Sequence, residues 1–471
     1  MLEKVSSAEN RRFPRARQSQ DFHEYLNDYR AGHPDDVLVI DEQVSSDQDI
    51  TAVLWALAEQ GKSPLLVFPK VAGLTMGVAT NIFGSRVRAA RMLGATPQTL
   101  HEAYQFYANQ LVPTELVSSA PILDVVERQH IDLSSLPMIR HFETDRAPYI
   151  TNGIIVAEHP DTGAGNLSYH RAMLHSPTEL ATSLHSRGHL WRLLAIAKER
   201  KTPLPVAMVI GAHPLFMLAA TARVPLGVDE REVAGGLFGE PLRIVKTPRY
   251  GIGVPACAEI VLEGVIDPTA EVQEGPFGEF TGYSSNRSTN NLLRVEIIMR
   301  RKNAMLIDVA GGNSAEHLNL GRIPRESEMV EKLKERFPSV TAVHYPSSGT
   351  HFHAYVALKQ VRPGEARQVM LGLLGWDPYL KTVIAVDHDV DVSQDASVLW
   401  ALATHFQPHR DILTVDGLPG SALDPSSSGI GTTSRMGLDA TRGPDFDSVR
   451  AEISPASIAR AAGILGRAGK L

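Results

Sequence analysis

The chain is poor in the features that mark secreted, membrane-spanning and nucleic-acid-binding proteins. Its 471 residues include one cysteine, Cys257, which excludes a disulfide framework and fits a reducing cytoplasm. It has no basic run, and its formal net charge of -7 argues against a nucleic-acid partner. The longest apolar run, residues 206–222, is interrupted by Gly211, His213 and Pro214 and is too short to span a membrane.

Several common functional signals are also missing. The first residues lack the basic and apolar regions of a signal peptide, so we expect a cytoplasmic protein. No G-x-G-x-x-G motif follows an expected strand, so a dinucleotide site is not indicated. Neither a G-x-S-x-G elbow nor a G-x-x-x-x-G-K-[ST] loop is present, which removes the commonest hydrolase and NTPase functions.

The patterns that are present predict an α/β protein of several domains. Apolar residues make up 43% of the chain and charged residues 21%, as in ordinary globular proteins, and the length predicts two or three domains. Residues 1–116 should form an α/β domain, because a helical apolar pattern that begins at Asp49 is followed by a strand at 64–68. Residues 117–303 hold short β-branched runs around a helix at 190–200, which predicts a β-barrel with inserted helices.

Residues 304–471 return to an α/β pattern, with a strand at 382–386 and a helix at 396–404. Three local patterns predict a helix start, a hairpin turn and a surface loop. Ser176-Pro-Thr-Glu179 has the form of a helix-starting capping box. Arg300 to Asn303 has the composition of a hairpin turn, and residues 418–435 that of a long surface loop.

Two carboxylates and an arginine are the strongest candidates for chemistry. Glu274 and Glu279 flank a Gly-Pro turn, so they lie on a loop and not on one helical face. One could stay ionised against a guanidinium while burial keeps the other protonated as a general acid. Arg171 could hold a carboxylate at two points. The alternatives are a turn with two solvated acids and a surface arginine at a strand end.

Asn166, His189 and Glu230 form a nitrogen and oxygen ligand set that suits Mn2+ or Mg2+ better than zinc. They lie far apart in the sequence, so their spacing does not decide the matter. His189 falls near an expected helix start, which would favour a phosphate, and the alternative is a core histidine. A second histidine pair, His351 and His353, should share one strand face in a structural role, because no third ligand adjoins it.

Taken together, these residues resemble the UbiD family of reversible decarboxylases, which use prenylated FMN. The resemblance covers most of the chain, and its motifs follow one another in the order expected for the family. They are residues 81–85 with 91–94, Asn166-x-x-x-x-Arg171, residues 229–235, 244–246, Glu274-Gly-Pro-Phe-Gly-Glu279 and residues 436–441.

The resemblance implies the domain plan in more detail. It implies an N-terminal α/β domain at 1–116, a central split β-barrel of flavin-reductase type at 117–303 that binds prenylated FMN, and a C-terminal α/β oligomerisation domain at 304–471. The assembly should be a homodimer or homohexamer.

The resemblance also implies roles for the candidate residues. Arg171, Glu274 and Glu279 would be the catalytic set, and Asn166, His189 and Glu230 the metal ligands at the cofactor phosphate, with K+ nearby. Some members have glycine at the position of His189. The cofactor-binding residues would be Asn166, Tyr169, His170, Arg171, Gly188, His189 and Glu230.

The implied activity is reversible, non-oxidative decarboxylation of an aromatic, heteroaromatic or α,β-unsaturated carboxylic acid, with prenylated FMN as a covalent electron sink. The partners would be this small acid, CO2 and a flavin prenyltransferase that supplies the cofactor. We expect residues near 425–435, with His317 or His351, to complete a pocket for a polar ring. Two other hypotheses are a non-catalytic flavin-binding assembly partner and a metal-dependent lyase without flavin.

Overall fold

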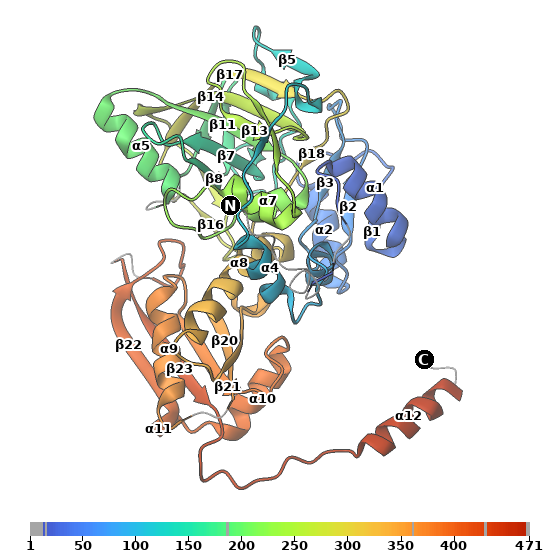
Figure 1. Ribbon diagram of the computed structural model, residues 1–471, viewed down its shortest axis with the longest axis vertical. Coiled ribbons are helices and arrows are strands. Elements are labelled where there is room, and N and C mark those ends of the chain that lie inside the picture. The colour runs from blue at the N-terminus through green and yellow to red at the C-terminus, as the bar shows by residue number, and fades with distance from the viewer. Residues whose placement is uncertain (1–12, 15–16, 185–187, 360–361, 428–430, 468–471) are drawn as a thin grey trace, which may run out of the picture.

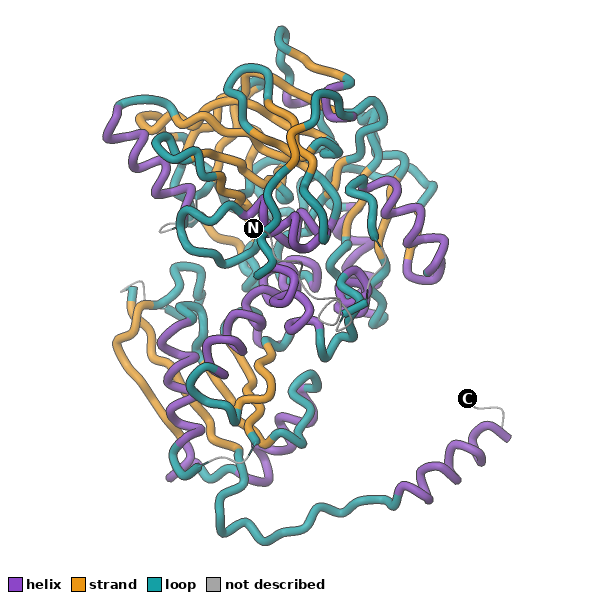
Figure 2. The backbone as a smooth tube through the Cα atoms, viewed as in Figure 1, coloured by secondary structure: helices purple, strands orange, loops and turns teal. Residues whose placement is uncertain are grey.

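The computed structural model describes residues 13–14, 17–184, 188–359, 362–427 and 431–467. It shows a multidomain α/β fold, in which the N-terminal and central parts form one body and a smaller C-terminal α/β body lies beside it (Figure 1). Strands fill the middle of the larger body and form the sheet of the smaller one (Figure 2). Within the described residues, no helix combines the length and apolarity needed to cross a bilayer.

The N-terminal part holds a four-stranded sheet in the order β1-β2-β3-β18. The helix expected from Asp49 is confirmed, but Gln48 is its N-cap residue, and the Asp49 carboxylate accepts from the Ser45 N–H at 2.7 Å. The buried strand expected at 64–68 is also confirmed. The elements are α1 (Phe22–Gly32), β1 (Val37–Val39), α2 (Asp49–Glu59), β2 (Leu65–Phe68), β3 (Val78–Thr80), α3 (Arg86–Met92), α4 (Leu100–Ala108) and, from later in the chain, β18 (Leu306–Ile307).

The central part is built on a nine-stranded antiparallel sheet in the order β6-β9-β10-β17-β14-β11-β7-β8, with β5 paired to β17. Side chains alternate between its faces, so Ile154 and Val156 enter one core while Ile155 enters the other. The strands are β5 (Val125–Glu127), β6 (Tyr149–Ile150), β7 (Gly153–Glu158), β8 (Gly165–Tyr169), β9 (Ala172–Ser176), β10 (Glu179–Thr182), β11 (Leu204–Ile210), β14 (Ile260–Glu271) and β17 (Asn291–Arg300).

Helices cover both faces of this sheet and bring their first residues to the site. The helix α5 (His189–Arg200) buries Leu190, Leu193 and Ala197 in one core, and α6 (Pro214–Ala219) and α7 (Glu230–Phe238) pack in the other. Two small sheets complete this part. They are β4 (Glu115–Leu116) with β12 (Arg243–Lys246) and β13 (Gly253–Pro255), and the pair β15 (Phe277–Gly278) and β16 (Ser284–Ser285).

The long helix α8 (Ala315–Lys334) leads from the larger body into the C-terminal sheet, whose order is β19-β20-β21-β23-β22. The strand and helix expected at 382–386 and 396–404 are confirmed. The elements are β19 (Val340–His344), β20 (His353–Leu358), α9 (Glu365–Trp376), β21 (Thr382–Asp387), α10 (Asp395–His405), α11 (Pro408–Asp411), β22 (Ile412–Pro419), β23 (Thr432–Ala440) and α12 (Pro455–Arg467), which stands away from both bodies (Figure 1).

Four local predictions were wrong. Ser176 to Glu179 forms the turn between β9 and β10, where the Ser176 hydroxyl lies 3.2 Å from the Glu179 carboxylate, so the capping-box pattern serves a hairpin. After Arg300 the chain leaves its sheet, and β18 pairs with β3 of the N-terminal sheet instead of β17. The loop expected at 418–435 is shorter, because β22 and β23 extend into it from both ends. His351 precedes β20 and so does not share that strand with His353.

Candidate active site

The candidate residues 166–171 lie on β8 and on the sharp connection to β9. Asn166 and Tyr169 belong to β8, and Arg171 directly precedes β9. The His170 N–H donates to the Gly153 carbonyl at 2.8 Å, and the Thr182 hydroxyl donates to the Arg171 carbonyl at 2.8 Å. The backbone around Arg171 is therefore held by strands on both sides, which fixes the direction of its side chain.

Arg171, Glu274 and Glu279 come together in one buried ion cluster. The Arg171 guanidinium donates through Nε and Nη2 to the two oxygens of Glu274, at 2.9 and 3.0 Å, and through Nη1 to Glu279 at 2.5 Å. Nη2 also donates to the Arg287 carbonyl at 2.9 Å. Glu274 and Glu279 are only 2% and 5% exposed, so the alternative of two solvated acids on a surface turn is wrong.

The loop that carries both carboxylates is held on several sides. The Phe277 ring centre lies 4.6 Å from the Arg171 guanidinium carbon. The Gly278 N–H donates to the Asp145 carboxylate at 2.9 Å, and the Glu279 N–H donates to the Tyr283 carbonyl at 3.0 Å. A side chain at Gly278 would collide with the Phe142 ring, which explains why glycine stands there.

Burial and the neighbouring charges shift the pKa values of several members of the cluster. It raises the pKa of Glu279 above its ordinary value, although the nearby Arg171 charge opposes this effect. Burial alone would lower the pKa of Arg171, but Glu279 and Glu274 reverse this and raise it, so the guanidinium stays charged. The pKa of the neighbouring Tyr149 hydroxyl is raised by burial and by Glu274, so it stays neutral. Glu279 is thus the member of the cluster that favours holding a proton.

Asn166, Glu230 and His189 converge from β8 and from the first residues of α7 and α5. One Glu230 oxygen accepts from the Leu167 N–H at 2.9 Å, and the other lies 3.8 Å from Nδ1 of His189. Within the described part of the chain, the buried Asn166 Oδ1 has no hydrogen-bond partner. Glu230 reaches β8 at Leu167, the residue after Asn166, and an unpaired amide oxygen, a carboxylate and an imidazole are together a donor set that fits a hard divalent cation. Among all the residues that the structure describes, no three His, Cys, Asp or Glu side chains lie close enough together to hold a metal ion, so a metal here would need the Asn166 amide as a ligand.

The other expected cofactor contacts lie close to these groups. The Tyr169 hydroxyl donates to the Met217 carbonyl at 3.2 Å. Both ring nitrogens of His170 have protein partners, the Ser168 hydroxyl at 2.8 Å and the Ser183 carbonyl at 3.1 Å. Gly188 is the N-cap residue of α5, directly before His189. Residues 185–187, which precede it, lie outside the described residues.

Sequence reasoning missed part of the site's surroundings. Asp145 and Phe142 hold the Glu279 loop, and neither stands in a motif that could have indicated this. Arg322 and Arg325 on α8 were also missed, because two arginines three residues apart are ordinary on a helix surface and only the structure shows that this helix is largely buried. Of the expected pocket residues 425–435, those at 428–430 lie outside the described residues.

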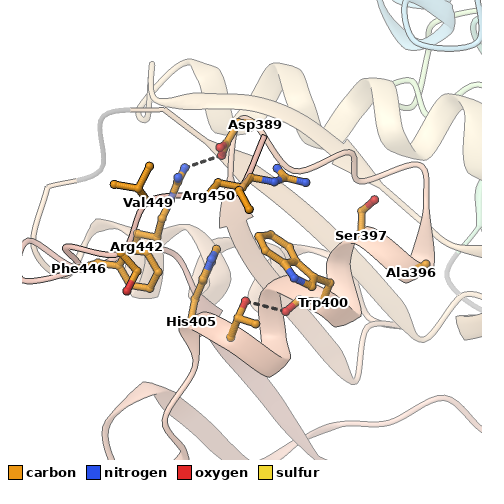
Figure 3. A pocket seen from close by; sticks show the side chains of 12 residues that line it. Asp389, Ala396, Ser397, Trp400, His405, Arg442, Phe446, Val449 and Arg450 are labelled. Atoms are coloured by element: carbon orange, nitrogen blue, oxygen red, sulfur yellow. Dashed lines mark hydrogen bonds and ion pairs between the residues drawn. The ribbon is translucent and has the colours of Figure 1, made fainter. Parts of the chain in front are cut away.

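A separate pocket of about 620 Å3 lies in the C-terminal part, between α10 and the segment that leads to α12 (Figure 3). Its lining includes Trp400, His405 and Arg442, and Arg442 forms an ion pair with Asp389 at 2.5 Å. It contains none of the candidate residues around Arg171. The geometry of Arg171, Glu274 and Glu279, and not this cavity, identifies the candidate active site.

Comparisons with known proteins show which proteins the whole chain is similar to. Three family models, all described for 3-octaprenyl-4-hydroxybenzoate carboxy-lyase, match the chain in order. The N-terminal domain model matches residues 32–105, the Rift-related domain model 115–314 and the C-terminal domain model 318–440.

Among curated proteins, the anhydromevalonate phosphate decarboxylase of Methanosarcina mazei is 33% identical over 386 residues, which are 82% of this chain and 89% of that protein. The enzyme of the same name from Methanothermobacter thermautotrophicus is 32% identical over 408 residues, 86% of this chain and 94% of that protein.

Among solved structures, HmfF from Pelotomaculum thermopropionicum in complex with FMN has a TM-score of 0.88 and 31% identity, covering 94% of this chain and 99% of that chain. An evolved dimeric form of HmfF in complex with prFMN has a TM-score of 0.84 and 30% identity, covering 93% and 100%. The vanillic acid decarboxylase of Sedimentibacter hydroxybenzoicus in closed form has a TM-score of 0.82 and 29% identity, covering 97% and 100%.

Proposed function

The chain belongs to the UbiD family of carboxy-lyases and is a decarboxylase, and from this premise we propose that it uses prenylated FMN to remove CO2 reversibly from an aromatic, heteroaromatic or α,β-unsaturated carboxylic acid. The observation that carries the proposal is the buried cluster of Arg171, Glu274 and Glu279. The complex of a similar protein with prFMN supports the cofactor.

Removal of CO2 from an sp2 carbon leaves an electron pair that no side chain can accept, and prenylated FMN supplies the electron sink when it is bound. Asn166, His189 and Glu230 would hold a Mn2+ or Mg2+ ion at the cofactor phosphate, with K+ beside it. The unpaired Asn166 oxygen supports this role. Tyr169 to Arg171 and Gly188 would line the cofactor, since they adjoin these ligands along β8 and α5.

Arg171 would orient the substrate carboxylate. A guanidinium matches a carboxylate in shape and charge, and Arg171 is held by the two oxygens of Glu274, so its orientation is set before the substrate arrives. The Phe277 ring against the guanidinium excludes water from one side. Glu274 therefore acts as a positioning residue, through Arg171.

Glu279 would deliver the proton that replaces CO2. Its carboxyl group accepts from Nη1 of Arg171, so it lies where the substrate carboxylate would be bound. Because burial raises its pKa, the carboxyl group can hold a proton until the carbon requires it. In the carboxylation direction the same oxygen would accept the proton.

The domain plan belongs to the same proposal. Residues 1–116, 117–303 and 304–471 would be the N-terminal, cofactor-binding and oligomerisation domains, and the nine-stranded sheet would be the core of a split barrel. A homodimer or homohexamer and a flavin prenyltransferase as cofactor supplier complete it. The hypothesis of a non-catalytic assembly partner is not supported, because the similar curated proteins are named as decarboxylases.

The test is to purify the full chain after co-expression with a flavin prenyltransferase and to identify the released cofactor by mass spectrometry. Prenylated FMN, together with CO2 release from a panel of unsaturated and aromatic acids, is the expected result. Folded protein that carries no flavin but decarboxylates with Mn2+ alone would overturn the proposal in favour of a metal-dependent lyase. A protein prepared without the prenyltransferase is the control.

A further inference from the structure

Two arginines on α8, the buried Arg322 and the largely buried Arg325, have more hydrogen-bond donors than the protein satisfies. Arg322 is 3% exposed, and its Nη2 donates to the Thr350 carbonyl at 3.1 Å. Its Nε, and both Nε and Nη1 of Arg325, are buried without a hydrogen-bond partner in the described part of the chain. Unsatisfied buried guanidinium donors are costly, so their retention calls for a ligand.

The nearby carboxylates are already engaged. Asp377 Oδ2 lies 3.5 Å from Nη1 of Arg325, which is an ion-pair distance, but this oxygen accepts from the Tyr345 hydroxyl at 2.8 Å. Glu326 accepts from Arg86 at 2.6 Å. Among the described residues Arg322 forms no ion pair within 4.0 Å, so an excess of positive charge is buried here.

The loop that faces these arginines adds two more unpaired polar atoms. The Thr350 hydroxyl and Nδ1 of His351 are buried without a hydrogen-bond partner within the described ranges. Thr350 also has a φ of 52°, a backbone conformation that is rare for a β-branched residue. Burial lowers the pKa of Arg322 to about 10 and the pKa of His351 far below its ordinary value, so the uncharged imidazole is one donor and one acceptor.

This cluster adjoins the proposed proton donor. Phe280 follows Glu279, and its ring centre lies 4.8 Å from the His351 ring and 5.8 Å from the Tyr379 ring. The Arg325 guanidinium lies 4.8 Å from the Tyr379 ring centre. His317, in the first turn of α8, contacts the Gly312 carbonyl at 2.9 Å. Its pKa is lowered mainly by burial and further by the charges of Arg171 and Arg322, so it lies between the two sites.

We propose that Arg322 and Arg325, with Thr350, His351 and His317, bind a second anionic group of the substrate, remote from the carboxylate that leaves. This inference rests on the proposed function, and it narrows the substrate to an unsaturated or aromatic acid with a further carboxylate or phosphate. A guanidinium pair with neutral hydroxyl and imidazole donors suits either group. The name of the similar archaeal enzymes, anhydromevalonate phosphate decarboxylase, includes such a phosphate.

The test measures binding by calorimetry to the cofactor-loaded full chain, with matched acids that differ in one anionic group. The pairs are 4-carboxycinnamate with cinnamate, and anhydromevalonate phosphate with anhydromevalonate. In one of the two pairs, we expect the acid with the additional anionic group to bind at least about tenfold more tightly than the acid without it. This ratio corresponds to one charge-assisted contact of about 1.4 kcal/mol. The pair that shows the preference distinguishes carboxylate from phosphate, and no preference in either pair overturns the proposal.

Substitutions assign the preference to the cluster. Arg322→Gln and Arg325→Gln should abolish it, whereas Arg336→Gln, at an exposed position just beyond α8, should leave it unchanged. The milder substitutions Arg322→Lys and Arg325→Lys keep the positive charge but lose the two-point geometry of a guanidinium, so they should reduce the binding preference in part. They provide the test if the glutamine variants do not fold. A preference that survives in folded variants overturns the proposal.

Calorimetry also separates this inference from the proposed function. If the acid with the additional anionic group binds more tightly but no acid releases CO2, the proposed function is contradicted and the anion site is supported. Equal binding and equal turnover of both members of each pair would support the function and overturn the anion site.

Discussion

The Arg171 guanidinium and the Glu274 carboxylate form a two-point ion pair, with Nε and Nη2 at 2.9 and 3.0 Å from the two carboxylate oxygens. The Glu274 side chain is buried and that of Arg171 is 13% exposed, and this geometry leaves one edge of the guanidinium directed to Glu279. Under the proposed function, the pair would therefore fix where a substrate carboxylate binds relative to Glu279, the proposed proton donor. The predictions begin from this relationship.

Substitution of Glu274 should reduce turnover by loosening Arg171. Glu274→Gln removes the charge but keeps the shape, and we expect kcat/KM for the best acid of the panel to fall by roughly 100-fold or more, since loss of a buried charge-assisted contact costs about 3 kcal/mol. Steady-state kinetics of the cofactor-loaded protein give the value. Glu271→Gln, an exposed change on the same segment, is the control, and equal activity of both variants would contradict the positioning role.

Activity should depend on the protonation of Glu279. Because burial raises its pKa, the protonated acid persists at higher pH than an ordinary glutamate, and decarboxylation should decline as pH rises through that pKa. Profiles of kcat/KM against pH should show this basic limb. Glu279→Gln should lose proton delivery and the limb together while it still binds cofactor. A basic limb that persists in Glu279→Gln would assign the titration to another group.

The sequence predicted the elements whose patterns are local. The helix at Asp49 and the strand at 64–68 follow from apolar periodicity, and the structure confirms them. The turn at Ser176 was mistaken for a helix start because the same serine and glutamate side chains can serve a hairpin. The hairpin expected at Arg300 failed because β18 finds its partner, β3, more than two hundred residues away, and no local pattern encodes that choice.

The candidate site, too, could be predicted from the sequence only in part. Glu274 and Glu279 stand in one short motif, and their meeting with Arg171 was expected from the chemistry of these residue types and from the family resemblance. The surroundings of α8 could not be found by motif, because Arg322 and Arg325 gain their meaning from burial and from missing partners, which are properties of the folded chain. Arg325 also depends on Tyr379, more than fifty residues away, for its packing.

A divalent cation should stabilise the folded protein through Asn166 and Glu230. Asn166 Oδ1 is buried without a hydrogen-bond partner among the described residues, so Mn2+ should coordinate this oxygen. Binding to the folded state should raise the melting temperature, most strongly when the cofactor is present. Glu230→Gln should abolish the increase. Glu232→Gln, on the same helix, should retain it. An equal increase in both variants would place the ion elsewhere, and calorimetric titration of Mn2+ would confirm the stoichiometry.

The buried Glu316 should make stability fall as pH rises. Burial and the nearby Asp308 raise its pKa from 4.5 to about 7, although the N–H groups of Phe83 and Asn81 oppose this by donating to it. A carboxyl whose pKa is raised on folding contributes stability below pH 4.5 that is lost as pH rises through about 7.

The wild-type chain should therefore lose roughly 2 to 3 kcal/mol of unfolding free energy, relative to Glu316→Gln, between about pH 5 and pH 8. Urea unfolding at several pH values measures this difference. Glu335→Gln, an exposed change at the end of α8, should show a difference from wild type that does not vary with pH. If the Glu316→Gln difference is equally flat, Glu316 is ionised throughout and its carboxylate is stabilised by the two backbone N–H groups that it accepts from.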